Sequence, residues 1–261
     1  MAAAAVAPKS KGKGKVPKDG NWLREALKRK EILCYVDIDI DGARAAYQLA
    51  CDFVAATNLT YGWTSQRLSE LGGSEKARLP DIFEADYEWS QKGKILLEPA
   101  SERIVIKVDA KASPLAAENF VALCDGLKGK SSNTGKPLHY VGCPFHRIVR
   151  GFVAQTGDIA TGTGAGGESI WGKKFKDDKD GLKKKLAKRG DVGMCNNGKN
   201  SNTSQFFFAF APLPKLSGKH VVLGEIVEGM EVLDAIEAAG ADDADGKPTV
   251  AVIIAGSGVL D

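Results

Sequence analysis

Residues 145–155, FHRIVRGFVAQ, and residues 204–208, SQFFF, decide how this 261-residue chain is interpreted. They place the cation of Arg147 and the amide of Gln155 among aromatic and β-branched residues, and no activated nucleophile accompanies them. An arginine and a glutamine within apolar runs are typical of a mostly apolar pocket with a few directed hydrogen-bond donors. Such a pocket suits catalysis by binding rather than by covalent chemistry.

The composition allows one main domain with additional segments. The chain is 43% hydrophobic, and all-β barrels of this length often form a single domain. The formal net charge is +3, but residues 1–30 contain nine Lys or Arg against Asp19 and Glu25, a net charge of +7. The rest of the chain is therefore acidic, and the basic character belongs to the N-terminal tail.

The N-terminal tail contains no recognisable export signal. Residues 1–20 are mainly Ala, Lys, Pro and Gly, without an apolar run for a signal peptide or a membrane span. We expect a disordered tail and a cytoplasmic protein, with the nucleus as the alternative. The lysines at 11–15 more often solubilise a chain than bind nucleic acid, so nucleic-acid binding is not expected. Five cysteines without regular spacing predict reduced thiols: Cys34, Cys51, Cys124, Cys143 and Cys195.

The first strand is expected at residues 32–40, where Val36, Ile38 and Ile40 share one face before a turn at Asp41-Gly42. The aspartates of this region imitate the start of a calcium loop. The twelfth loop position is Gln48, which cannot supply the bidentate carboxylate, so we expect no calcium site.

The next strand is expected only at residues 103–108, so residues 43–101 form a long connection between two strands. Helical spacing predicts helices at 43–57 and 80–91, with a short third at 64–71. The aromatic residues of this segment either form a partner-binding face or pack against the parent domain, and we favour packing. These residues are Trp63, Phe83, Tyr87 and Trp89.

The remaining pattern is mainly β. A helix is expected at 112–123, with Ser113 as its N-cap and Pro114 in its first turn. Many short strands with two helices indicate a barrel or a sandwich, which periodicity alone does not separate. The other expected strands lie at 146–154, 192–195, 205–210, 221–226 and 250–255, and the second helix lies at 229–239.

In order and spacing, these motifs, with Gly157-Asp158 and Gly218-Lys219-His220, resemble the cyclophilin family of peptidyl-prolyl cis-trans isomerases from Glu102 to Leu260. The resemblance implies a mainly β fold, an eight-stranded closed antiparallel barrel capped by two helices. That domain would cover residues 32–261, with a helical insertion at 43–101, after the tail at 1–20 and a short helix at 21–31. It also implies isomerisation of Xaa-Pro bonds and assistance to folding, without a covalent intermediate, cofactor or metal.

The same resemblance assigns roles to individual residues. Arg147 would be the central catalytic residue, with its guanidinium directed at the peptide carbonyl and the prolyl nitrogen. The other catalytic assignments are Phe152, Gln155, Phe207 and His220. Residues that would contact the substrate are Val153, Gly164, Cys195, Asn196, Asn197, Gln205, Lys215 and Leu216.

Several positions depart from the family pattern. Val153 stands where many members carry Met, Asn197 where Ala is usual, and Lys215 where well-known members carry Trp. We therefore expect weak binding of cyclosporin-type ligands and a preference for acidic residues near proline. The alternative is a low-activity module that binds Pro-containing segments, with the insertion recruiting a protein partner. Ser257 replaces the second cysteine that in some relatives pairs with a residue matching Cys124, so that thiol switch is not expected.

Three other patterns carry no function in our interpretation. The glycines at 162–167 satisfy a dinucleotide motif, but no βαβ unit surrounds them. The three histidines are too scattered for a zinc site. The basic run at 173–189 lacks interleaved aromatic residues and predicts a solvated loop.

Overall fold

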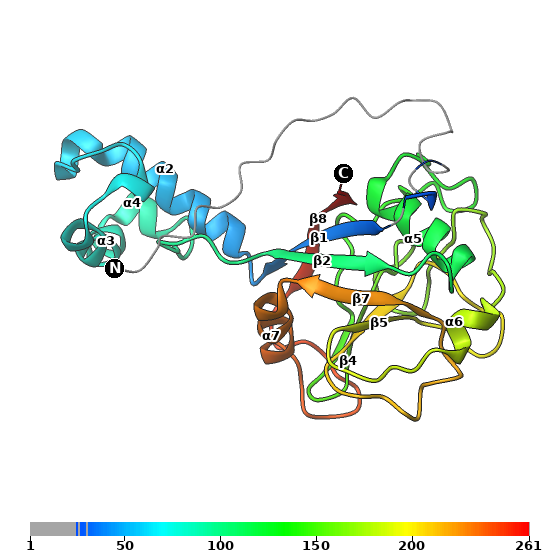
Figure 1. The fold of residues 1–261 in the computed structure, drawn as a ribbon. Helices are drawn as coiled ribbons and strands as arrows, with labels where there is room; N and C mark the ends of the chain where they lie inside the picture. The colour runs from blue at the N-terminus through cyan, green and yellow to red at the C-terminus, as the bar shows by residue number, and fades with distance from the viewer. Residues whose placement is uncertain (1–24, 26, 30, 261) are drawn as a thin grey trace.

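The computed structural model describes residues 25, 27–29 and 31–260 (Figure 1). The tail predicted at 1–20 lies outside these residues, and the helix predicted at 21–31 lies largely outside them. Among the helices of the described residues, none is long and apolar enough to cross a membrane.

A single antiparallel sheet forms the body of the described chain. Its eight strands follow the order β3-β4-β6-β5-β7-β2-β1-β8. The segment predicted as one strand at 146–154 is a hairpin, because Gly151 turns the chain with φ of 68°. The strands are β1 (Ile32–Ile40), β2 (Arg103–Val108), β3 (Arg147–Val149), β4 (Val153–Thr156), β5 (Asp191–Met194), β6 (Phe206–Ala209), β7 (Val222–Glu228) and β8 (Val252–Val259).

The predicted closure of the barrel is wrong. The sheet curls into a half-barrel, and its edge strands β3 and β8 form no ladder with each other. The chain just before β3 does contact β8, through an isolated bridge between Pro144 and Ile253 and through backbone hydrogen bonds that join residues 142–145 to Val252 and Ile254. Pro144 has no N–H to extend a ladder. The outer edge of β3 is also already occupied, because Ile148 N–H donates to Gly246 O at 2.7 Å and Ala241 N–H donates to Ile148 O at 3.1 Å.

Two helices cover the core of the sheet, α5 (Pro114–Asp125) and α7 (Met230–Ala238). The α5 helix buries Phe120, whose ring meets Phe206 edge-on with centroids 5.1 Å apart. Ser113 is the N-cap residue and Pro114 lies in the first turn, as predicted, but the Ser113 hydroxyl makes no capping bond and donates to Val222 O at 2.6 Å. Asp178, from a distant loop, accepts the N–H groups of Leu115 and Ala116 instead, at 3.2 and 2.9 Å.

A helical segment connects β1 to β2 and projects beyond the ends of these strands (Figure 1). It contains α2 (Ala43–Tyr61), the 3-10 helix η1 (Leu68–Glu70), α3 (Gly73–Ala85) and α4 (Tyr87–Ser90). The helix predicted at 80–91 is therefore wrong in its bounds. Pro80 lies inside α3, and the Asp86 carboxylate caps a separate α4 by accepting the N–H groups of Glu88 and Trp89.

The aromatic residues of the helical segment pack mainly against one another, not against the parent domain as we expected. The Phe53 ring lies at their centre, 5.1 Å from Phe83, 5.4 Å from Trp89 and 6.4 Å from Trp63 between ring centroids. Tyr87 does not join them and is 83% exposed. The segment thus has an apolar cluster of its own, separate from the core under the sheet.

Candidate active site

The β3–β4 hairpin places Arg147 directly opposite Gln155, with both side chains partly exposed. The Nε and Nη2 groups of Arg147 donate to the carbonyl oxygen of Ala244 at 3.1 and 2.7 Å. Its guanidinium carbon lies 5.9 Å from the centre of the Phe152 ring. One edge of the guanidinium is therefore fixed by the backbone, and Nη1 makes no hydrogen bond to any described residue.

An apolar surface lies beside this arginine. Val153 and Phe207 form its floor, and each is only 1% exposed. Phe152, Cys195 and Leu216 pack on that floor while keeping part of their surface open to solvent. Further support comes from Leu186, Ala209, Leu213 and Val222 in the same cluster.

His220 closes one side of the apolar surface. Its ring meets Phe207 edge-on, with ring centroids 5.6 Å apart and an interplanar angle of 88°. His220 Nδ1 lies 3.0 Å from Met194 O, so the ring is anchored to β5 when this nitrogen carries the proton. The orientation of His220 is thus set by an aromatic contact and a backbone carbonyl together.

Gln205 links the apolar surface to the glycine loop. Its amide Nε2 donates to Gly164 O at 3.0 Å and to Gly166 O at 2.7 Å. Asp158, only 2% exposed, holds the same loop by accepting the N–H groups of Gly164, Gly166 and Thr161. Burial by itself raises the pKa of Asp158, but these bonds and the Thr161 hydroxyl outweigh it and lower the pKa to about 2. The loop is therefore organised around a carboxylate that stays ionised at neutral pH.

Residues 195–197 form the other rim. Burial raises the pKa of the Cys195 thiol to about 12, against the opposing charge of Arg147, so the thiol is neutral. Asn196 Nδ2 donates to Lys219 O at 2.8 Å, which ties this rim to the loop before His220. Asn197 is exposed, as is Lys215 in the facing loop, and Lys215 has no hydrogen bond or ion pair with any described residue.

The structure thus brings most of the predicted residues together. Pairing in the hairpin, the apolar cluster and the contact with His220 join the five residues assigned to catalysis. Asn197 and Lys215 lie beside this set only through their sequence neighbours, with no direct contact to it recorded.

Sequence reasoning missed two supporting positions. Ala244 holds Arg147 through its backbone oxygen, from 97 residues away, and an alanine gives no signal for that role. Gly193 lies under the Phe207 ring, because a Cβ at this position would stand 2.5 Å from Phe207 Cζ. A glycine inside a strand does signal close approach of another group, so Gly193 was detectable.

His146, next to Arg147, was also left without a role. Its Nδ1 is buried without a hydrogen-bond partner among the described atoms. Burial lowers the pKa of His146; the charge of Asp158 opposes that shift and the charge of Arg147 adds to it. A neutral imidazole at this position avoids placing a second cation beside the guanidinium.

A curled antiparallel sheet, with an arginine fixed at its edge beside an apolar surface, defines a β protein whose site is built for binding an apolar group next to a polar one. In the described residues, no group of three His, Cys, Asp or Glu side chains is placed to hold a metal ion. The profile of the family described as "Cyclophilin type peptidyl-prolyl cis-trans isomerase/CLD" matches residues 95–259, more than half of the chain. The chain therefore belongs to the cyclophilin family.

The matched region contains the whole candidate site but begins after most of the helical segment. The first strand, β1, also lies outside the match, although it pairs with β2 and β8 in the sheet. Our interpretation of the helical segment as an insertion into a family domain accordingly stays a prediction.

Proposed function

We propose that this protein is an active peptidyl-prolyl cis-trans isomerase that acts on Xaa-Pro bonds in proteins and assists their folding. The observation that carries the proposal is the Arg147 guanidinium, fixed by Ala244 O beside the surface of Val153 and Phe207. Membership of the cyclophilin family supports the class of reaction. We further propose a cytoplasmic or nuclear location, to be tested by imaging the tagged full-length chain.

The chemistry of the reaction fits such a surface. Rotation about an Xaa-Pro bond loses amide resonance over a barrier of roughly 20 kcal/mol and takes tens to hundreds of seconds without a catalyst. No bond to carbon is broken. A catalyst must hold the proline ring and donate a hydrogen bond that is stronger to the twisted amide than to the planar one.

In this proposal the residues of the site have separate roles in binding and catalysis. The proline ring lies on Val153 and Phe207, with Phe152, Leu216 and His220 around it. Arg147 directs its unpaired Nη1 at the prolyl amide, where apolar neighbours strengthen the interaction by excluding water. Gln155 and the backbone of Asn196 hold the peptide chain, while Cys195, Asn197, Gln205 and Gly164 line the adjacent groove.

The test is NMR exchange spectroscopy on an Ala-Pro-Phe peptide with catalytic amounts of protein. Wild type should accelerate cis-trans exchange, and Arg147→Ala should abolish the acceleration while the protein stays folded. Arg67→Ala is the matched control, because Arg67 is an exposed arginine of the helical segment whose guanidinium pairs with nearby Glu70. Wild-type protein that is folded but leaves the exchange rate unchanged would refute the proposal.

A second function is favoured by two rim residues. Exposed Lys215 and Asn197 replace the residues usual in the family, so the site could hold Pro-containing segments with little turnover. Saturable peptide binding without accelerated exchange would establish that function. It would also direct attention to the helical segment, whose predicted role is to recruit a protein partner through exposed groups such as Tyr87.

The charge of Lys215 leads to two narrower proposals about ligands. Peptides with Glu beside proline should bind more tightly than the same peptides with Lys, and an equal affinity for both series would end this idea. Cyclosporin-type ligands should bind weakly, and Lys215→Trp should strengthen their binding, since the substitution exchanges a solvated ammonium for an apolar ring.

A further inference from the structure

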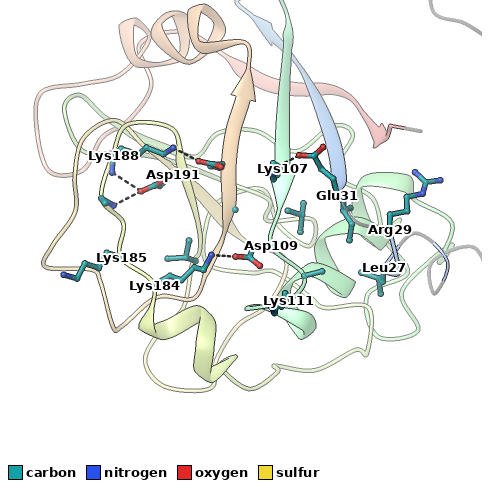
Figure 2. Close-up of a pocket in the computed structure, with 17 residues that line it drawn as sticks. Leu27, Arg29, Glu31, Lys107, Asp109, Lys111, Lys184, Lys185, Lys188 and Asp191 are labelled. Carbon is teal, nitrogen blue, oxygen red and sulfur yellow. Dashed lines mark hydrogen bonds and ion pairs between the residues drawn. The ribbon is translucent and has the colours of Figure 1, made fainter.

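A groove of about 690 Å³ lies outside the candidate active site (Figure 2). None of its lining residues contacts the substrate in the proposed isomerase reaction, and of them only Val222 also belongs to the apolar cluster that supports that site. Its walls are the end of β2, the facing part of β7, the chain at 184–191 and the residues just before β1. A volume of this size is sufficient for several side chains of a bound peptide.

The acidic groups that line this groove are already engaged. Asp109 pairs with Lys184 and Glu225 pairs with Lys188, as the dashed lines in Figure 2 mark. The Asp191 carboxylate accepts the N–H groups of Ala187 and Lys188 at 2.6 and 2.9 Å. Glu31 pairs with Lys107 at 2.6 Å. A cationic ligand would therefore find no carboxylate that is free of an existing partner.

Two cations of the groove remain available. Lys111 and Lys185 are exposed, and their side-chain ammonium groups make no hydrogen bond or ion pair with any described residue. Figure 2 shows them on either side of the Lys184–Asp109 pair, one beyond the end of β2 and the other on the 184–191 segment. The groove thus presents two unpaired ammonium groups from two different walls.

Between these walls the lining is largely aliphatic. Buried Ile32, Val108 and Val222 line the groove together with Leu27 and Ala110. Among the described residues, no aromatic ring lines it, so they offer no surface on which a nucleic-acid base would stack. The backbone N–H groups of Ala187 and Lys188 are already engaged by the Asp191 carboxylate and are not available to a phosphate. These features disfavour a nucleic acid or an isolated phosphate as the ligand.

We propose that this groove binds an acidic peptide segment of a partner protein, independently of proline. Aliphatic side chains of the segment lie on Ile32, Val108 and Val222, and its carboxylates pair with Lys111 and Lys185. The proposal does not rest on the isomerase activity, because the two sites share no side chain that contacts a ligand in both. A partner bound in the groove would leave Arg147 open to a prolyl substrate.

The test uses a fluorescein-labelled peptide without proline, Glu-Val-Glu-Leu-Glu-Val-Glu, and the full chain. Fluorescence anisotropy should show saturable binding that weakens as salt is added. The double variant Lys111→Glu and Lys185→Glu should bind about tenfold more weakly or worse, as expected for reversal of two charges at an interface rim. Lys174→Glu is the matched control, because Lys174 is an exposed lysine of the same basic run outside the groove, and its side chain pairs with none of the residues that the structure describes.

Each result of this experiment decides for or against the proposal. Binding lost in the double variant, kept in Lys174→Glu and unchanged in Arg147→Ala supports it. Three results overturn it: no saturable binding, equal weakening by Lys174→Glu, or displacement of the acidic peptide by an Ala-Pro-Phe peptide. The last of these would place the peptide in the isomerase groove. Accelerated prolyl exchange in the double variant shows that it is folded, and circular dichroism replaces that control if the isomerase proposal itself fails.

Discussion

Replacing Arg147 with lysine tests whether the shape of the side chain, rather than its charge, supports catalysis. The guanidinium has five N–H donors in a planar fork, whereas the lysine ammonium is a point charge with three rotatable donors. In the structure Nε and Nη2 both donate to Ala244 O, which leaves the opposite edge of the fork for a substrate. A lysine that keeps the bond to Ala244 O loses the directed donor, and one that reaches the substrate loses its anchor.

The size of the effect follows from the number of lost bonds. Removing one preorganised donor to a transition state typically costs about 10²–10³ in rate, roughly 3–4 kcal/mol. We expect Arg147→Lys to lower kcat/KM about 10²-fold, mainly through kcat, because the donor acts most strongly on the twisted amide. The stability cost should be small, about 1 kcal/mol, since only hydrogen bonds to a carbonyl on an exposed loop are lost.

The assay pairs peptide exchange or protease-coupled kinetics with urea unfolding of the same samples. Arg67→Lys serves as the control for exchanging an arginine far from the site. The reasoning fails if Arg147→Lys keeps kcat/KM within threefold of wild type, because charge alone would then suffice. It also fails if unfolding free energy and rate fall together to the same extent, since the loss would then be structural.

Three further predictions follow from individual contacts. Gly193→Ala places a Cβ 2.5 Å from Phe207 Cζ, so it should lower the free energy of unfolding in urea by about 1–3 kcal/mol and slow isomerisation. Gly73→Ala is the control and should change neither quantity, because the space around Gly73 is open. Wild-type activity in Gly193→Ala would show that the position of Phe207 does not matter. Because the Asp158 pKa is lowered from 3.8 to about 2, its contribution of about 2 kcal/mol is complete above roughly pH 4 and lost as pH falls toward 2. Asp158→Asn should abolish that part of the pH dependence of unfolding, and an unchanged profile would contradict it. With a pKa of about 12, Cys195 carries a thiolate fraction of about 10⁻⁴ at pH 8, so iodoacetamide should label it only after unfolding. Rapid labelling of Cys195 in the native protein, detected by mass spectrometry, would contradict this prediction.

Local sequence patterns predict most of the helices and strands at their observed positions. The alternation at 32–40 and the β-branched run at 103–108 predict β1 and β2 with their observed bounds, because residues of both strands are buried in the same core. The helix predicted from residue 43 does begin there, after Asp41 and Gly42 turn the chain with positive φ. In each case the signal lies within the element, so tertiary contacts add nothing that changes it.

The errors in the predicted fold come from contacts between residues that lie far apart in the sequence. The cap of α5 comes from Asp178, more than 60 residues along the chain, and the edge of β3 is covered by residues near 241–246. Neither contact can be predicted from the local sequence. The site divides in the same way: its side chains follow from their order and types, but the anchor of Arg147 is a backbone oxygen that any residue supplies.

The helical segment shows how an addition can be fixed to a sheet without sharing its core. Arg44, in the first turn of α2, bonds Glu102 through Nε at 2.7 Å and lies 3.6 Å from an oxygen of Asp37 in β1. Arg103 of β2 donates to the same Asp37 at 2.7 and 2.9 Å. These ion pairs join both ends of the segment to the paired strands that it connects, while Phe53 and its aromatic neighbours form a separate apolar cluster. Since β1 and β2 lie far from β3 in the strand order, the segment can vary in sequence without altering the backbone contact that holds Arg147.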